Sequence, residues 1–78
     1  MLYFVGAGPG AADLITMRGY KLLTKADVVI YAGSLVNPKL LNFTKEGCEI
    51  HNSAYMTLEE VIKIVEKAEA ENKMTVRL

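Results

Sequence analysis

The sequence predicts an α/β fold, a mainly parallel sheet whose strands alternate with helices along the chain. Two observations carry this prediction: short apolar runs rich in β-branched and aromatic residues, and longer segments of helical periodicity between them. The expected strands are residues 2–5, 27–32, 48–51 and 74–78. Regular alternation of strands and helices is typical of parallel sheets with right-handed crossovers.

The first strand and helix are joined by a glycine-rich turn. The run "LYFV", Leu2–Val5, ends at Gly6 and has the length of a buried strand. Asp13 can cap a helix that runs to about Lys25. One face of that helix would carry Ile15, Gly19, Leu22, Leu23 and Ala26. Because a glycine costs a helix roughly 1 kcal/mol relative to alanine, we expect close packing on the sheet at Gly19.

The middle of the chain predicts two further strands. "DVVIYA", residues 27–32, indicates a buried strand, and the turn after it leads to Pro38, which suits the first turn of a short helix capped by Asn37. "CEIH", Cys48–His51, then predicts a third and shorter strand.

The segment "MTLEEVIKIVEKAEAENK" carries several independent helix signals. Thr57 and Glu60 have the spacing of a capping box, and Met56 with Val61 that of a hydrophobic staple. The predicted buried stripe consists of Leu58, Val61, Ile62, Val65 and Ala68. "NKMTVRL" then indicates a turn and a final strand, so we expect these residues to be part of a longer protein.

Composition excludes several classes of function. The 78 residues suit one small domain, and nine Lys and Arg balance nine Asp and Glu without a basic cluster, which argues against nucleic-acid binding. The apolar start "MLYFV" is too short for a signal peptide or a membrane span. The lone Cys48 favours a reduced, cytoplasmic protein, and the lone His51 lacks a partner at metal-ligand spacing.

The glycine turn formally matches a dinucleotide-binding fingerprint. Gly6, Gly8 and Ala11 have its spacing. However, no acidic residue follows the second strand to hold a ribose, and Pro9 removes a backbone N–H that would face a pyrophosphate. A nicotinamide-dependent oxidoreductase is therefore disfavoured, although a free-standing α/β ligand-binding module stays open.

The neighbouring residues indicate a different family. "VGAGPGAADLITMRG", residues 5–19, resembles the first signature of the tetrapyrrole methylases, which use S-adenosylmethionine in the sirohaem and cobalamin pathways. "DVVIYAGSLVNPKLL" and "SAYMTLEEVI" are similar to the cobalamin-branch members that act on precorrin-4 or cobalt-precorrin-4. The resemblance covers all 78 residues and implies the N-terminal domain of a two-domain C-methyltransferase, whose Gly-Asp-Pro turn would come after this segment.

That resemblance also implies roles for single residues. Gly8, Pro9 and Gly10 would contact S-adenosylmethionine, and the tetrapyrrole would meet four positions on the rim at the strand ends: Gly6, Tyr31, Ser34 and Ser53. Sirohaem-branch relatives place an acid where this chain has Ala32, so that branch is disfavoured and no catalytic base is assigned.

Three expectations concern assembly. The resemblance implies a homodimer for the full-length enzyme, with no membrane or nucleic-acid partner. Because most contacts to the methyl donor would come from outside these residues, the 78-residue chain alone should bind it weakly and lack activity. Apolar surface that the second domain would cover should also promote self-association.

Overall fold

A computed structural model describes residues 1–5, 17–33 and 38–78. The described elements, in chain order, are β1 (Leu2–Phe4), α1 (Met17–Lys25), β2 (Val28–Tyr31), the 3₁₀ helix η3 (Pro38–Phe43), β3 (Glu49–Asn52), the short 3₁₀ helix η4 (Ser53–Tyr55), α2 (Leu58–Ala70) and β4 (Thr75–Arg77). The predicted alternation of strands and helices is confirmed.

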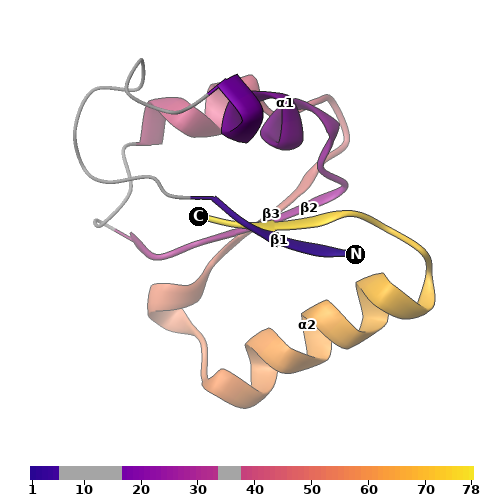
Figure 1. The fold of residues 1–78 in the computed structure, drawn as a ribbon. Coiled ribbons are helices and arrows are strands. Elements are labelled where there is room, and N and C mark those ends of the chain that lie inside the picture. The colour runs from indigo at the N-terminus through magenta and orange to yellow at the C-terminus, as the bar shows by residue number, and fades with distance from the viewer. Residues whose placement is uncertain (6–16, 34–37) are drawn as a thin grey trace.

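The four described strands form one parallel sheet in the order β1-β4-β2-β3. In register, Leu2 lies beside Thr75 and Thr75 beside Val28, so the last strand inserts between the first two. Figure 1 shows α1 and η3 on one face of this sheet and α2 on the other. The expected parallel α/β architecture is therefore confirmed.

The face beneath α1 holds the larger of two cores. Its buried residues include Leu23 of α1, Ala26 just after that helix, Val29 of β2, Leu40 of η3 and Val76 of β4. Gly19 is buried, as close helix packing requires. The ring of Tyr20 meets that of Phe43 edge to face at 5.2 Å, which joins α1 to η3.

The face beneath α2 holds the second core, built from Val28 and Ile30 of β2 with Val61 and Ala68 of α2. The predicted start of this helix is confirmed. The Thr57 hydroxyl accepts a hydrogen bond from the Glu60 backbone N–H at 3.2 Å, and the Glu60 carboxylate accepts one from the Thr57 N–H at 3.3 Å. Met56 packs against the same core, as expected of the staple.

Two predictions of burial are wrong, and both fall on the same side of the molecule. Leu58 and Ile62, assigned to the buried stripe of α2, are 74% and 45% exposed, and Phe4 of the first strand is 74% exposed. The physical reason is that β1 lies at the edge of the sheet. The apolar stripe of α2 is wider than the part of the sheet that α2 covers.

Boundaries differ from the prediction by one or two residues. β3 runs from Glu49 to Asn52 rather than from Cys48, and β4 is limited to Thr75–Arg77. β3 is also an edge strand, so Glu49 and Ile50 are exposed. The expected cap Asp13, the helix residue Ile15 and the cap Asn37 lie outside the described residues.

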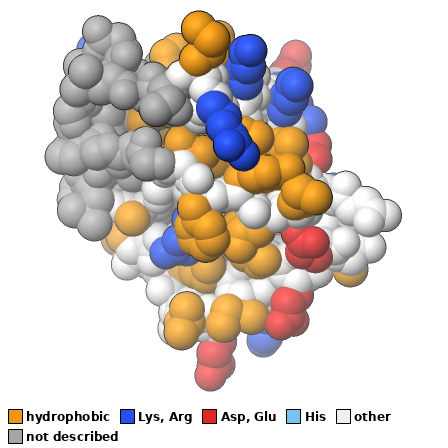
Figure 2. Space-filling model, in the orientation of Figure 1, with side chains coloured by type: hydrophobic (Ala, Val, Ile, Leu, Met, Phe, Trp, Pro, Cys, Tyr) orange, Lys and Arg blue, Asp and Glu red, His pale blue; other side chains and the backbone are white. Residues whose placement is uncertain are grey.

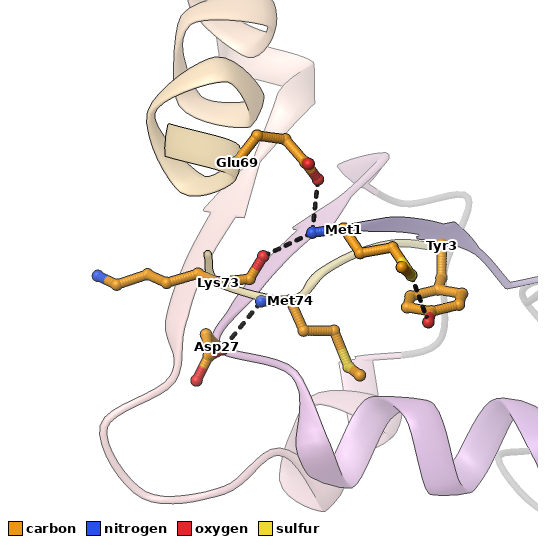
Figure 3. A network of polar contacts seen from close by, with 6 residues as sticks. All are labelled: Met1, Tyr3, Asp27, Glu69, Lys73 and Met74. Carbon is orange, nitrogen blue, oxygen red and sulfur yellow. Dashed lines mark hydrogen bonds and ion pairs between the residues drawn. The ribbon is translucent and has the colours of Figure 1, made fainter. Parts of the chain in front are cut away.

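A polar network joins the amino ends of the strands (Figure 3). The Met1 ammonium donates to the Lys73 carbonyl at 2.8 Å and pairs with the Glu69 carboxylate. Asp27, just before β2, accepts a hydrogen bond from the Met74 N–H at 2.9 Å. This network fixes the start of β4 between its neighbours, and it lies at the end of the sheet opposite the expected ligand rim.

Candidate functional site

The candidate site is the rim formed by the carboxyl ends of the parallel strands, where ligands bind in sheets of this kind. The structure describes four parts of this rim: Val5 after β1, residues 31–33 at the end of β2, residues 52–57 at the end of β3, and Leu78 after β4. The Leu78 N–H donates to the Ile30 carbonyl at 2.9 Å, which holds the end of β4 against β2.

One hydrogen bond joins the loops after β2 and β3, and a second lies within the loop after β3. The Ser53 hydroxyl donates to the Tyr31 carbonyl at 3.0 Å, and the Asn52 side-chain oxygen accepts from the Ala54 N–H at 3.0 Å. Two predicted substrate residues, Tyr31 and Ser53, are thus brought together. The Ser53 hydroxyl proton is engaged with the protein, which leaves its oxygen as a possible acceptor for a ligand.

Gly33 is a rim residue that sequence reasoning passed over as part of a turn. Its φ is +52°, and a Cβ added there would stand 2.9 Å from the Cβ of Ala54. Both the backbone conformation and the close approach of η4 therefore require glycine. Its position directly after the predicted strand was the signal that the sequence offered for Gly33. Its close approach to Ala54 could be seen only in the folded structure.

The two rim tyrosines have different environments. Tyr31 is half-buried and packs against the core beneath α1, whereas Tyr55 is largely exposed on η4. Tyr31 can therefore shape the floor of a site, while Tyr55 can contact a bound molecule by its ring face.

In the described rim the charged side chain is that of Arg77, the last residue of β4, which lines the hollow beside Phe4 and Ile62. The rest of the described rim is uncharged. From residue 31 to 33 and from 52 to 57 it consists of small, amide, hydroxyl, aromatic and thioether side chains. Asp27, the acid that directly precedes β2 in the chain, stands at the opposite end of the sheet, where a hydrogen bond from Lys45 and another from the Met74 backbone lower its pKa. Residues 31–33 and 52–57 thus include no acid that could hold a ribose and no base that could pair with a pyrophosphate.

Other chemistry-bearing side chains lie away from the rim. His51 is 2.8 Å from the Glu49 carboxylate, and this hydrogen bond lowers the pKa of Glu49. Cys48 packs against the α1-side core, and burial raises the pKa of its thiol. Within residues 1–5, 17–33 and 38–78, no three His, Cys, Asp or Glu residues are grouped to hold a metal ion.

No helix in the described part of the chain has the length and apolar character needed to cross a membrane.

Five predicted site residues fall outside the described ranges. These are the predicted cofactor-binding residues Gly8, Pro9 and Gly10 and the predicted substrate residues Gly6 and Ser34. Their assigned roles stay predictions.

Comparison with known proteins places these residues in context. Residues 1–78 match the family model described as Tetrapyrrole (Corrin/Porphyrin) Methylases. The chain is 57% identical over 74 residues to a cobalt-precorrin-4 C(11)-methyltransferase of Methanocaldococcus jannaschii, covering 95% of this chain and 29% of that protein. It is 48% identical over 77 residues to a precorrin-4 C(11)-methyltransferase of a Sinorhizobium species, covering 99% of this chain and 30% of that protein.

A solved structure agrees with the sequence matches. The crystal structure of a cobalt-precorrin-4 methyltransferase, CbiF, superposes with a TM-score of 0.91 at 50% identity, covering 97% of this chain and 32% of that one. The chain thus spans about a third of the length of the proteins it matches.

Proposed function

Because this chain belongs to the tetrapyrrole methylase family, we propose that it is the N-terminal domain of an S-adenosylmethionine-dependent C-methyltransferase. The proposed substrate is precorrin-4 or cobalt-precorrin-4, in cobalamin biosynthesis. Two relatives named for methyl transfer to these substrates support this choice, at 57% and 48% identity. The cytoplasm as location and a homodimer as full-length assembly are parts of the same proposal.

The single structural observation that carries the proposal is the uncharged surface of residues 31–33 and 52–57. Phosphate groups are bound by cations or by a series of free backbone N–H groups, and a ribose by an acid. Residues 31–33 and 52–57 carry neither type of charged side chain and offer the small residues Ala32 and Gly33 beside two tyrosines. A sulfonium group and a broad, flat macrocycle fit such a surface, since aromatic rings attract cations and small residues allow close approach.

The residues divide into two proposed groups. Gly8, Pro9 and Gly10 would hold the methyl donor, which supplies an electrophilic methyl group on a sulfonium when it is bound. Gly6, Tyr31, Ser34 and Ser53 would contact the tetrapyrrole. The protein's own contribution is to align the nucleophilic carbon with that methyl group and to exclude water. The hydrogen bond from Ser53 to the Tyr31 carbonyl would keep the β2 and β3 loops in one arrangement.

A hybrid enzyme tests this proposal. Residues 1–78 replace the matching segment of the M. jannaschii protein, and methylation of cobalt-precorrin-4 is followed with a labelled methyl donor. We expect activity close to that of the parent, because the two segments share 57% of their residues. Ser53→Ala should lower it, since the tie between the two rim loops is lost; Ser53→Thr keeps the hydroxyl and serves as the control.

A folded hybrid that lacks activity on both precorrin-4 forms would refute the proposed substrate. The competing binding-module hypothesis is tested on the 78-residue chain alone by calorimetry. We expect weak or undetectable S-adenosylmethionine binding, because the proposed site is completed by a second domain. Micromolar binding by the isolated chain would favour the module.

A further inference from the structure

Tyr55 is the most exposed large apolar side chain in the described part of the chain, at 87%. It belongs to η4, which directly follows the carboxyl end of β3 and so lies on the rim of the candidate site. Apolar side chains are exposed elsewhere as well: Figure 2, which faces the β1 edge of the sheet, shows hydrophobic side chains gathered over the middle of the view. Exposure alone therefore assigns no role to Tyr55.

The neighbours of Tyr55 in residues 52–57 all make contacts that hold the fold. Two take part in hydrogen bonds at the rim, one lies close to Gly33, one packs against the core beneath α2, and one caps that helix: Asn52, Ser53, Ala54, Met56 and Thr57. The Tyr55 side chain makes no hydrogen bond or ring contact with any described residue. The fold therefore gains little from an aromatic ring at this position.

The backbone on both sides of Tyr55 is nevertheless fixed. The Asn52 side-chain oxygen accepts from the Ala54 N–H at 3.0 Å, and the Met56 N–H donates to the Ser53 carbonyl at 3.2 Å. The hydroxyl of Ser53 connects this turn to the end of β2. A tyrosine on a fixed backbone has two side-chain torsions to order, so its ring can contact a ligand at a small cost in conformational entropy.

The residues beside Tyr55 on the rim are small and uncharged. Ala32 and Gly33 follow β2, and a Cβ added at Gly33 would stand 2.9 Å from the Cβ of Ala54, so the two loops approach closely there. Small side chains let a broad ligand lie close to the backbone, and an aromatic ring next to them can stack on a conjugated surface. This combination fits one face of a conjugated macrocycle.

We propose that Tyr55 is a substrate-binding residue whose ring stacks on the conjugated face of the tetrapyrrole. This inference rests on the proposed function, because it takes the tetrapyrrole as the substrate. Stacking stabilises the bound substrate and the transition state alike, so loss of the ring should raise KM and leave kcat nearly unchanged. The hydroxyl group has no part in stacking, so phenylalanine should replace tyrosine at this position.

The kinetics of Tyr55 variants in the hybrid enzyme test this proposal. Tyr55→Ala should raise KM for cobalt-precorrin-4 about five- to tenfold, while kcat and KM for S-adenosylmethionine stay within about twofold. Tyr55→Phe keeps the ring, and Ile50→Ala removes a side chain that is 41% exposed on β3, away from the rim. Both controls should leave all three constants within about twofold of those of the parent hybrid.

Urea unfolding of the 78-residue chain separates a binding role from a structural one. Because the Tyr55 side chain is 87% exposed, Tyr55→Ala should have the same unfolding midpoint as the parent chain. A lower midpoint would show that the ring stabilises the fold, and this would overturn the proposal.

The kinetic outcomes that overturn the proposal differ from those that refute the proposed substrate. An active hybrid in which Tyr55→Ala leaves KM for cobalt-precorrin-4 unchanged overturns the role of Tyr55 alone. A rise in KM for S-adenosylmethionine instead would assign the ring to the methyl donor, and an equal loss in Tyr55→Phe would assign the effect to the hydroxyl; both overturn the stacking. A folded hybrid that is inactive on both precorrin-4 forms refutes the proposed substrate, and this inference with it.

Discussion

The two flanks of α2 are built from opposite chemistry. On the β1 side the hollow is apolar and has a volume of about 280 Å³. On the β3 side a hollow of about 250 Å³ is lined mainly by charged and polar side chains: Glu49, His51, Lys67, Glu71 and Lys73. Both strands are edges of the same sheet, and both hollows lie beneath the same helix.

The two edge strands therefore differ in the side chains that they expose to water in the hollows beside α2: those of β3 are charged or polar, and those of β1 are apolar. Charged side chains on an edge strand oppose pairing with another strand, and the hydrogen-bonded Glu49 and His51 do so on β3. On β1 the equivalent positions on the same face, in register across the sheet, are Leu2 and Phe4. The β3 edge therefore carries side chains that oppose pairing with a further strand, and these two positions of β1 carry apolar ones.

The largest change in the free energy of unfolding is expected for a substitution in the core between α2 and the sheet. Ile30 belongs to β2, which lies between β4 and β3 in the sheet, and its side chain is fully buried beneath α2. Ile30→Ala should lower the free energy of unfolding by about 2–5 kcal/mol, because it removes packing and leaves a cavity. Urea unfolding measures this. Ile50→Ala, at an exposed position of β3, is the control and should cost far less; equal losses would mean that α2 is not seated on Ile30.

A second change should stabilise the chain from the β1 side. Thr75 is fully buried in β4 next to Leu2 in register, and its hydroxyl has no hydrogen-bond partner among the described residues. Thr75→Val removes the unpaired polar group at nearly constant volume, so the free energy of unfolding should rise by about 1 kcal/mol or more. Thr75→Ser keeps the hydroxyl and loses a methyl group, and should destabilise. A destabilised valine variant would show that the hydroxyl has a partner.

Much of this fold could be predicted from the sequence, because local signals and the global fold agree. The capping box at Thr57 and the apolar run of β2 each depend on residues that are close together in the sequence, and both are confirmed. The exposure of Leu58 and Ile62 could not be predicted. Periodicity tells which side chains share a helix face, but only the strand order shows how far the sheet extends beneath that face.

Some features of the candidate site could likewise be predicted from the sequence, and others could not. The location of the rim and its lack of an acid after β2 followed from the residues and the parallel topology alone. The hydrogen bond from Ser53 to the Tyr31 carbonyl and the contact of Gly33 with Ala54 join loops that are about twenty residues apart in the chain. No local pattern records such pairs, since they depend on the packing of β2 against β3.

A smaller effect is expected at the start of the helix that separates the two hollows. Thr57→Ala removes the acceptor for the Glu60 N–H and should cost about 1 kcal/mol, measured by urea unfolding. Thr57→Ser retains the acceptor and should restore most of the loss. If both variants are equally destabilised, the methyl group rather than the cap holds this end of α2.

The smallest effect belongs to the β3 edge and depends on pH. The hydrogen bond from His51 is the main cause that lowers the pKa of Glu49 below its ordinary 4.5. A carboxylate whose pKa is lower in the folded state stabilises the fold above its unfolded pKa, and this stabilisation is lost as pH falls through the folded value. Because the Glu49 side chain is 57% exposed, solvent screening limits the contribution to below about 1 kcal/mol.

The variant Glu49→Gln isolates this contribution. Urea unfolding between about pH 6 and about pH 3 should show a shallower loss of stability in the variant than in the parent chain. Part of the pH dependence should remain, because the pKa of Asp27 is also lowered, chiefly by its hydrogen bond with Lys45. At the β1 edge, Ile62→Ser should leave the pH profile unchanged, since no acid is removed. Identical profiles for parent and Glu49→Gln would show that the Glu49–His51 pair does not stabilise β3, and the contrast between the two edges would then rest on the apolar groove alone.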